Sequence, residues 1–181
     1  MPGENLNIGT QARDGAFAEK ISVPISNLVK LPDDFDMEIA GIIEPAAVAY
    51  NNTKDIKQSN VVVIAVGAIG LIATKMLKLN KNKVIAVDIA KESLNMALKI
   101  GADFAVNIKD KDAIKQIKDF LKEKKVDYVI VYFTSFDTVD FALDIIKKLG
   151  EIRVIGLYSE DFLKINFCKF QMNYIKLKGC Y

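Results

Sequence analysis

Histidine is absent from the 181-residue sequence. Its absence removes the side chain most often used as a general base near neutral pH and the commonest ligand of protein-bound metals. Cysteine is scarce, with two residues, Cys168 and Cys180, that lack C-x-x-C spacing. A secreted disulfide scaffold would be small and dense in cysteine, so we interpret both as free thiols.

No charge of one sign dominates, since 25 Lys and Arg residues face 23 Asp and Glu residues. The lysines are scattered among acids along the chain, which argues against a nucleic-acid partner. The longest apolar stretch, Val61 to Ala73, is shorter than the roughly 20 residues of a membrane span. The segment MPGENLNIG also lacks the order of a signal peptide, so we expect a cytoplasmic protein with no membrane partner.

From Ser59 onward, short β-rich runs alternate with longer amphipathic segments, a pattern typical of a parallel sheet covered by crossover helices. The runs predict strands at 60–66, 83–88, 104–107, 127–133, 152–156 and 174–179. Between them, helical periodicity predicts helices at 69–79, 91–100, 111–124 and 137–149. We therefore predict an α/β fold, a doubly wound Rossmann sheet of six parallel strands.

The amino-terminal part has a different pattern. AFAEKISVP and NLVKLP favour two short strands ended by Pro24 and Pro32, too few to bury a core. The next segment, DDFDMEIAGIIEPAAVAYNN, has acidic residues at a helix start followed by an apolar face. Pro45 interrupts it, which predicts two helical pieces.

The sequence AVGAIG stands where the first predicted strand meets the first predicted helix. Its spacing matches the dinucleotide-binding fingerprint G-x-G-x-x-G, with Ala65 in place of the first glycine. Gly67 would let a pyrophosphate approach backbone amides, and Gly70 would let the helix pack closely on the strand. We predict that Gly67, Ala68, Ile69 and Gly70 bind the cofactor. The alternative is that such a turn needs small residues for packing alone.

A carboxylate supports the nucleotide interpretation. Asp88 ends the second predicted strand, 18 residues after Gly70 (88 − 70), where an acid accepts hydrogen bonds from the adenosine ribose hydroxyls. It would repel a 2′-phosphate, so we expect a preference for NAD over NADP. The alternative is that Asp88 caps the helix that begins near Lys91.

Across nearly its full length the chain resembles the zinc-type medium-chain dehydrogenases, which include alcohol, sorbitol and threonine dehydrogenases. The resemblance lies in DGAFAEKISVPISNLVKLPDD, IIEPAAVAYN, VVVIAVGAIGLIA, KVIAVDIAKESLNMALKIGADFAVN, KKLGEIRVIGLY and IKLKGCY. It implies a two-domain enzyme, with a GroES-like catalytic domain that holds zinc and a Rossmann domain that holds NAD(P). By this resemblance, residues 1–35 are a remnant of the GroES-like domain, 36–58 are junction helices and 59–181 are the NAD-binding domain.

The resemblance also sets the expectation for metal. Compared with the family pattern, the chain begins after the zinc-ligating cysteine and the histidine–glutamate pair and stops at the sixth strand. Glu44, in IIEP, matches a position where polyol and threonine enzymes place an acid beside the metal, and a helix-terminal carboxylate is the alternative. It is the lone candidate ligand. A catalytic zinc needs about three protein ligands, so we expect no bound zinc and little activity of this chain alone.

Two loops complete the expected cofactor site. Phe133 and Thr134, in VYFTSFD, should lie near the adenine or nicotinamide ribose, with core packing of the aromatic side chains as the alternative. The resemblance places Gly156 and Leu157, in IGLY, where the family backbone meets the nicotinamide amide.

Functions of two classes are compatible with these observations. In the first, the chain is the NAD(H)-binding domain of an alcohol or polyol oxidoreductase. In the second, it is a non-enzymatic Rossmann scaffold or dimer module whose cleft is spoiled by Ala65 and the VYFTS loop. Another class of nucleotide-using enzyme, such as a methyltransferase, would also need the glycine turn and the acid. It would not account for the dehydrogenase-like segments outside them, so it is the least favoured hypothesis.

A homodimer is expected through the last predicted strand, YIKLKGC, which would be the sheet edge. In similar dehydrogenases this edge pairs with its twin, and an exposed edge is a template for pairing. Four apolar residues precede the strand: Phe162, Ile165, Phe167 and Phe170.

Overall fold

The computed structural model describes residue 9 and residues 14–122, 125–156 and 164–180. The chain divides into two compact units, Met1–Ala40 and Gly41–Tyr181. The three domain predictions concern function: residues 1–35 as a remnant of the catalytic domain, 36–58 as the junction and 59–181 as the NAD-binding domain. A division by compactness does not test them, and they stay predictions.

The first unit lacks the two short strands predicted for it. Its described residues form a 3-10 helix, η1 (Ile25–Asn27), and a short helix, α1 (Met37–Ala40), and none of them is in a strand. A strand needs neighbours that pair with its backbone and cover one of its faces. Phe17 and Val29 are exposed, so these segments bury no apolar face of their own. The prediction of strands in AFAEKISVP and NLVKLP is therefore wrong.

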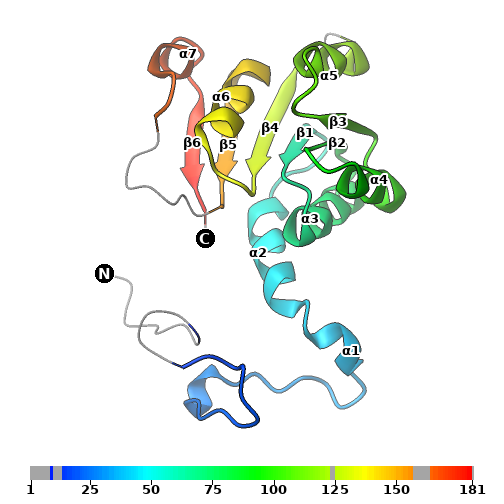
Figure 1. The fold of residues 1–181 in the computed structure, drawn as a ribbon, viewed down its shortest axis with the longest axis vertical. Coiled ribbons are helices and arrows are strands. Elements are labelled where there is room, and N and C mark those ends of the chain that lie inside the picture. Colours follow the sequence, from blue (N-terminus) through cyan, green and yellow to red (C-terminus); the bar gives the residue numbers. More distant parts are fainter. Residues whose placement is uncertain (1–8, 10–13, 123–124, 157–163, 181) are drawn as a thin grey trace. The chain divides into compact units, whose positions relative to one another are not determined.

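The second unit is a sheet of six parallel strands with helices on both faces (Figure 1). The strand order β3-β2-β1-β4-β5-β6 is that of a doubly wound dinucleotide-binding fold and confirms the predicted fold class. The strands are β1 (Asn60–Ile64), β2 (Lys83–Asp88), β3 (Phe104–Asn107), β4 (Val126–Val131), β5 (Ile146–Val154) and β6 (Lys176–Gly179). The helices are α2 (Ile43–Thr53), α3 (Ala68–Leu79), α4 (Lys91–Ile100), α5 (Ala113–Leu121), α6 (Phe136–Ile145) and α7 (Phe167–Met172).

Apolar side chains form one layer on each face of this sheet. Alternate residues of a strand point to opposite faces. Val61 and Val63 of β1 therefore pack in the layer with α3 and α4, whereas Val62 and Ile64 pack in the layer with α5 and α6. All four are buried, which is why β1 is a continuous apolar run rather than an alternating one.

Two helices end earlier than their periodicity predicts. Helix α5 stops before Lys122, whose backbone is left-handed with φ 50°. Helix α6 stops at Ile145 because Ile146 is already extended and begins β5. Residues 146–149, predicted as helix, therefore belong to a strand.

The segment before the sheet forms the two predicted helical pieces, α1 and α2. The break falls at residues 41–42 and not at the proline. Pro45 lies in the first turn of α2, where the missing N–H would have no partner within the helix in any case.

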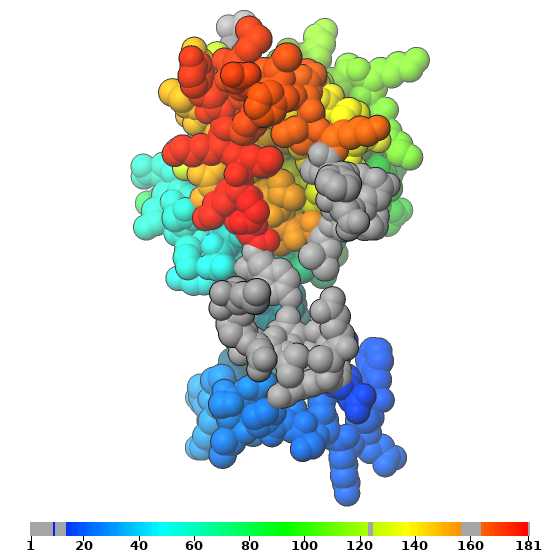
Figure 2. Space-filling view, turned by 90° about the vertical axis from the view of Figure 1, so that its left-hand side faces the viewer, coloured from blue at the N-terminus to red at the C-terminus, as the bar shows by residue number. Residues whose placement is uncertain are grey.

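The last strand, β6, is a free edge of the sheet. Among the described residues it pairs only with β5, and all four of its own residues are exposed. Figure 2 shows this strand, in red, at the surface of the molecule. Among the residues described, no helix combines the length and apolar character needed to cross a membrane.

Candidate functional site

The predicted cofactor residues come together at one edge of the sheet. Parallel pairing sets Ile64 of β1 beside Val87 of β2 and beside Val131 of β4. Val131 in turn pairs with Val154 of β5. The glycine turn, Asp88 and the loops after β4 and β5 therefore all leave the sheet at its carboxyl-terminal edge (Figure 1). Ligands of open α/β sheets bind at this edge.

The turn after β1 follows the path of a glycine turn although its first position is alanine. Ala65 has φ 68°, in the left-handed region. There the Cβ of an L-residue crowds the following carbonyl oxygen, at a cost of about 1–2 kcal/mol. The N–H of Ala65 donates to the carbonyl of Val87 at 2.9 Å, so the neighbouring strand holds the residue in place. The turn accommodates the methyl group, and the cost is backbone strain.

The turn has glycine at positions 67 and 70 for different reasons. A Cβ on Gly70 would lie 2.3 Å from the carbonyl oxygen of Ala65, so the packing of α3 on the turn requires glycine. A Cβ on Gly67 would meet no atom within 4 Å, and its φ of −71° suits any residue. The packing alternative therefore explains Gly70 but not Gly67. The open space at Gly67 leaves the backbone accessible to a ligand.

Helix α3 begins at this turn without a side-chain cap. Gly67 is its N-cap residue, and Gly67 and Ala68 are exposed. The first backbone N–H groups of a helix have no partner within the helix. In α3 they belong to Ala68, Ile69 and Gly70. With the helix dipole they favour an anion, and because only backbone is needed, apolar side chains can occupy these positions.

Asp88 joins the glycine turn to the end of β2. The N–H of Val66 donates to Oδ2 of Asp88 at 2.8 Å. The N–H groups of Ile89 and Ala90 donate to Oδ1 at 2.7 and 2.9 Å. Ala90 is the N-cap residue of α4, and among the described residues no side chain caps that helix. A capping side chain accepts from the second or third N–H of the helix, so the hydrogen bonds of Asp88 are to the loop before α4 and do not match the capping alternative. A carboxylate offers about four acceptor positions. Three are used by the backbone, and one on Oδ2 is left for a ligand.

The loops after β4 and β5 pack tightly against each other. A Cβ on Gly156 would lie 2.5 Å from the carbonyl oxygen of Tyr132. The hydroxyl of Thr134, which is buried, donates to the carbonyl of Gly156 at 2.6 Å. Phe133 between them is 63% exposed at the carboxyl-terminal edge. Leu157, predicted to bind the nicotinamide, lies outside the described residues.

The core-packing alternative for this loop applies to Tyr132 and not to Phe133. The ring of Tyr132 packs in the apolar layer of α3 and α4. Its hydroxyl is buried and has no hydrogen-bond partner among the described residues. Burial raises the pKa of this hydroxyl above its usual value. Tyr132 is therefore a neutral packing residue beneath the turn.

A buried ion-pair network on β5 escaped the sequence analysis. Arg153 is 2% exposed, and its guanidinium donates to both carboxylate oxygens of Asp55 at 2.7 Å. It also donates to Glu151 at 2.7 Å and to the carbonyl of Asn52 at 2.8 Å. These hydrogen bonds from Arg153 lower the pKa of Asp55 to about 2. The network ties the end of α2 to the sheet, which sequence spacing does not reveal because the partners are 98 residues apart.

Glu44, the lone metal-ligand candidate, lies exposed in the first turn of α2. In the described ranges no three His, Cys, Asp or Glu residues are grouped so that they could hold a metal ion. Cys168 and Cys180 are free thiols, as predicted. A zinc site takes about three protein ligands. The described residues do not fit one, and we assign no chemical step to a metal.

Comparison with known sequences identifies related enzymes. The sequence profile described as zinc-binding dehydrogenase matches residues 68–181. Sorbitol dehydrogenase of Bacillus subtilis is 26% identical over 178 residues, which are 96% of this chain and 50% of that enzyme. Galactitol 1-phosphate 5-dehydrogenase of Escherichia coli is 31% identical over 154 residues, which are 82% of this chain and 44% of that enzyme. The chain thus spans about half the length of these relatives.

Solved structures agree with this result. A short chain alcohol dehydrogenase from Escherichia coli, complexed with the cofactor NADH, superposes with a TM-score of 0.81 at 25% identity, over 93% of this chain and 50% of that protein. Galactitol-1-phosphate dehydrogenase from Escherichia coli gives a TM-score of 0.80 at 27% identity, over 93% of this chain and 51% of that protein. The profile match covers more than half of the chain and includes Gly70 of the turn and Asp88. The chain therefore belongs to the zinc-binding dehydrogenase family and corresponds to the Rossmann-fold half of its zinc-type medium-chain members.

Proposed function

We propose that this chain binds NAD(H) and is the cofactor-binding part of an alcohol or polyol dehydrogenase. The observation that carries the proposal is the link between Asp88 and the glycine turn. Because the N–H of Val66 donates to Asp88, the carboxylate is fixed beside the turn, where a ribose follows a bound diphosphate. A relative of the same fold is solved with NADH, and other relatives carry the names of sorbitol and galactitol 1-phosphate dehydrogenases.

Each residue of the site would act on a different part of the dinucleotide. The backbone N–H groups of Ala68, Ile69 and Gly70 at the start of α3 would bind the diphosphate, and Gly67 would leave the space that it needs. The hydrogen bond from the hydroxyl of Thr134 to the carbonyl of Gly156 would lie beside the nicotinamide end of the bound dinucleotide. The bound dinucleotide would supply the hydride-carrying ring, and the protein would supply binding and orientation.

Asp88 would select the cofactor by charge. Its free acceptor position on Oδ2 suits a ribose hydroxyl, whereas a 2′-phosphate would place a second negative charge on the same carboxylate. We therefore expect NADH to bind more tightly than NADPH. Asp88→Asn should reduce that preference, because the repulsion is removed and an amide oxygen remains to accept hydrogen bonds from the backbone of Ile89 and Ala90. The amide nitrogen in place of Oδ2 cannot accept from the N–H of Val66, so the affinity for NADH should also fall.

The test is a calorimetric or fluorescence titration of the purified chain with NADH. Gly67→Ala is the decisive variant, because the added methyl group meets nothing in the protein but occupies the space that the diphosphate would need. It should weaken NADH binding at least tenfold and leave the melting temperature nearly unchanged. Gly41→Ala is the matched control, since a Cβ there also meets nothing within 4 Å and the residue lies before α2, away from the turn.

Thermal melting separates binding from the scaffold alternative. A ligand of the native state at 100 times its Kd stabilises the protein by about 2.7 kcal/mol. For a chain of this size that is a rise in Tm of roughly 5–10 °C. A melting temperature that does not respond to millimolar NADH would contradict the proposal and favour a non-enzymatic Rossmann scaffold.

We further propose that the chain alone turns over little substrate, because its described residues hold no group of metal ligands. Alcohol oxidation in zinc enzymes needs a metal that polarises the substrate oxygen. The experiment is to incubate the chain with NAD and zinc and with sorbitol or galactitol 1-phosphate, and to follow nicotinamide absorbance. Steady formation of NADH that Gly67→Ala abolishes would contradict this part of the proposal.

A homodimer through β6 is the proposed assembly. The strand exposes its whole length at the sheet edge. Leu177 in this strand and Phe167 at the start of α7 are exposed apolar residues. Phe162, which we expected to contribute, lies outside the described residues. Light scattering at micromolar concentration should give twice the chain mass of 20.1 kDa. A Leu177→Lys variant should give the single mass, and a wild-type particle of 20.1 kDa would rule out the dimer.

A further inference from the structure

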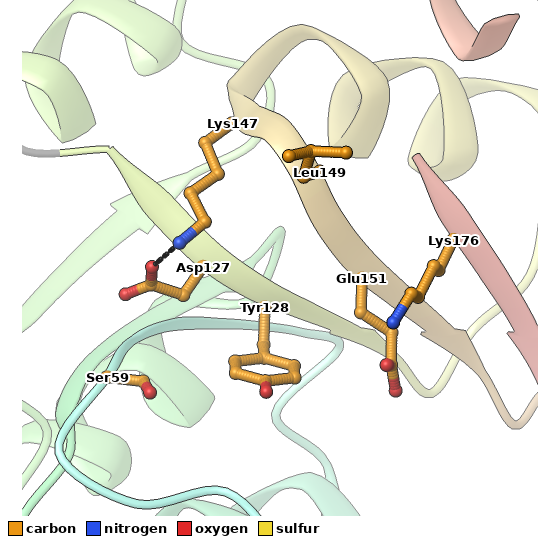
Figure 3. Close-up of a pocket in the computed structure, with 7 residues that line it drawn as sticks. All are labelled: Ser59, Asp127, Tyr128, Lys147, Leu149, Glu151 and Lys176. Atoms are coloured by element: carbon orange, nitrogen blue, oxygen red, sulfur yellow. Dashed lines mark hydrogen bonds and ion pairs between the residues drawn. The ribbon is translucent and has the colours of Figure 1, made fainter. Parts of the chain in front are cut away.

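At the amino-terminal edge of the sheet, opposite the candidate cofactor edge, the described residues line two hollows that NAD binding would not use. The smaller has a volume of about 180 Å³ and lies at the start of β4 and β5 (Figure 3). Its charges balance: Lys147 pairs with Asp127, and the other two charged residues are Lys176 and Glu151. This hollow has no net attraction for an ion.

The larger hollow has a volume of about 750 Å³ and lies between the carboxyl-terminal ends of α5 and α6. Two acids line it, Asp119 and Asp144, and Asp144 pairs with Lys169 at 2.6 Å. Five lysines line it: Lys118, Lys122, Lys125, Lys147 and Lys148. The chain as a whole carries a formal charge of only +2. The fold therefore brings two short lysine-containing segments, 118–125 and 147–148, together at this hollow.

Four of these five lysines have no acidic partner in the part of the chain that the structure describes. Lys147 is the exception, because it pairs with Asp127. The others, Lys118, Lys122, Lys125 and Lys148, form no ion pair within 4.0 Å among the described residues. Of the two acids that line the hollow, Asp144 pairs with Lys169, and Asp119 forms no ion pair among the described residues. Counted over its described lining residues, the hollow has a net positive charge.

Helix capping does not account for this arrangement. Lysines near the end of a helix stabilise its dipole, which explains Lys118 and Lys122 of α5. It does not explain Lys125, which precedes β4, or Lys148, which comes from the start of β5. Lysines from three separate elements meet over an apolar floor that includes Ile117.

We propose that this hollow is a second ligand site, for a small molecule that carries at least two negative charges. Its volume is within the range of about 300–1,000 Å³ that is usual for small-molecule sites. Several ammonium groups around one concave surface attract phosphate or carboxylate groups. None of the residues that line the hollow belongs to the proposed NAD site. The site is independent of the proposed NAD site.

The test uses inorganic tripolyphosphate, titrated calorimetrically into the full chain at low ionic strength. The wild-type chain should bind about one equivalent. Lys118→Gln with Lys122→Gln should weaken binding about tenfold, because two exposed charges at the hollow are removed. Lys111→Gln with Lys115→Gln is the matched control, since these exposed lysines lie at the other end of the same helical segment and line neither hollow.

Three results would overturn the proposal: no saturable binding, equal weakening by both pairs of substitutions, or many equivalents bound per chain. The last two would show that tripolyphosphate associates with surface lysines in general. All four lysines are exposed, so the variants should fold, and their melting temperatures verify it. In the Gly67→Ala variant the added methyl group occupies the space of the proposed diphosphate site, so this variant should still bind one equivalent of tripolyphosphate at the hollow. Its titration separates binding at the hollow from binding at the proposed NAD site.

Discussion

Replacing Ala65 with glycine should stabilise the protein, although most alanine-to-glycine substitutions do the opposite. Ala65 is held at φ 68°. An L-residue in this region costs about 1–2 kcal/mol, and glycine is free of that cost. Glycine in turn gives up about 0.5–1 kcal/mol through the greater freedom of the unfolded chain. At the midpoints of these two ranges the difference is a net gain of about 0.75 kcal/mol, or roughly 2–3 °C in Tm for a chain of this size.

The measurement is equilibrium unfolding in urea, monitored by circular dichroism, for Ala65→Gly and a control. Ala47→Gly is the control, because Ala47 is exposed in the middle of α2, where glycine costs about 0.5–1 kcal/mol. The two variants should shift the unfolding midpoint in opposite directions. A loss of stability in Ala65→Gly equal to that in Ala47→Gly would refute the left-handed turn and the strain assigned to it.

Two further predictions concern packing and pH. Gly70→Ala should destabilise the protein by about 1–3 kcal/mol, because its Cβ would lie 2.3 Å from a backbone oxygen. Urea unfolding measures the loss, with Gly67→Ala as a control whose added methyl group meets no atom of the protein. The pKa of Asp55 is lowered to about 2 from 3.8, so its contribution to stability is complete above pH 4 and is lost as the pH falls towards 2. The carboxylate is 57% exposed, so solvent screening limits the contribution to about 1 kcal/mol. Acid unfolding of Asp55→Asn should lack this part of the pH dependence, and a profile identical to that of the wild type would contradict the role of Arg153.

The sheet and the candidate site were predictable to the extent that their signals are local. The strands β2 and β3 and the helix α4 match their predicted bounds, because continuous apolar runs and helical periodicity lie within each segment. Asp88 could be found because the distance from a glycine turn to the next strand end is set by one intervening helix. The hydrogen bonds that the Asp88 side chain accepts from Val66 and Ala90 could not be predicted from the sequence, because they depend on how β1 and β2 meet.

The errors share a physical cause. The segments AFAEKISVP and NLVKLP have the composition of strands, but a strand forms only where another strand pairs with it, and composition does not show whether a partner exists. Residues 146–149 continue the helical pattern of α6, yet pairing of Ile146 with Val126 of β4 draws them into the sheet. In both cases contacts with distant residues outweigh the local preference.

The sequence by itself determined the order of strands and helices, the turn at AVGAIG and the acid at its side, because periodicity and turn chemistry act over a few residues. Only the tertiary structure decided that Gly70 is required by packing and Gly67 is not, that Ala65 is strained, and that Arg153 reaches Asp55. The same holds for the lysines around the larger hollow. The contact of Arg153 with Asp55 joins residues that are 98 positions apart, and the sheet and α2 must pack before it can form. The conformation of Ala65 and its contact with Gly70 are close in sequence, but they depend on the backbone path that the turn takes where β1 meets β2.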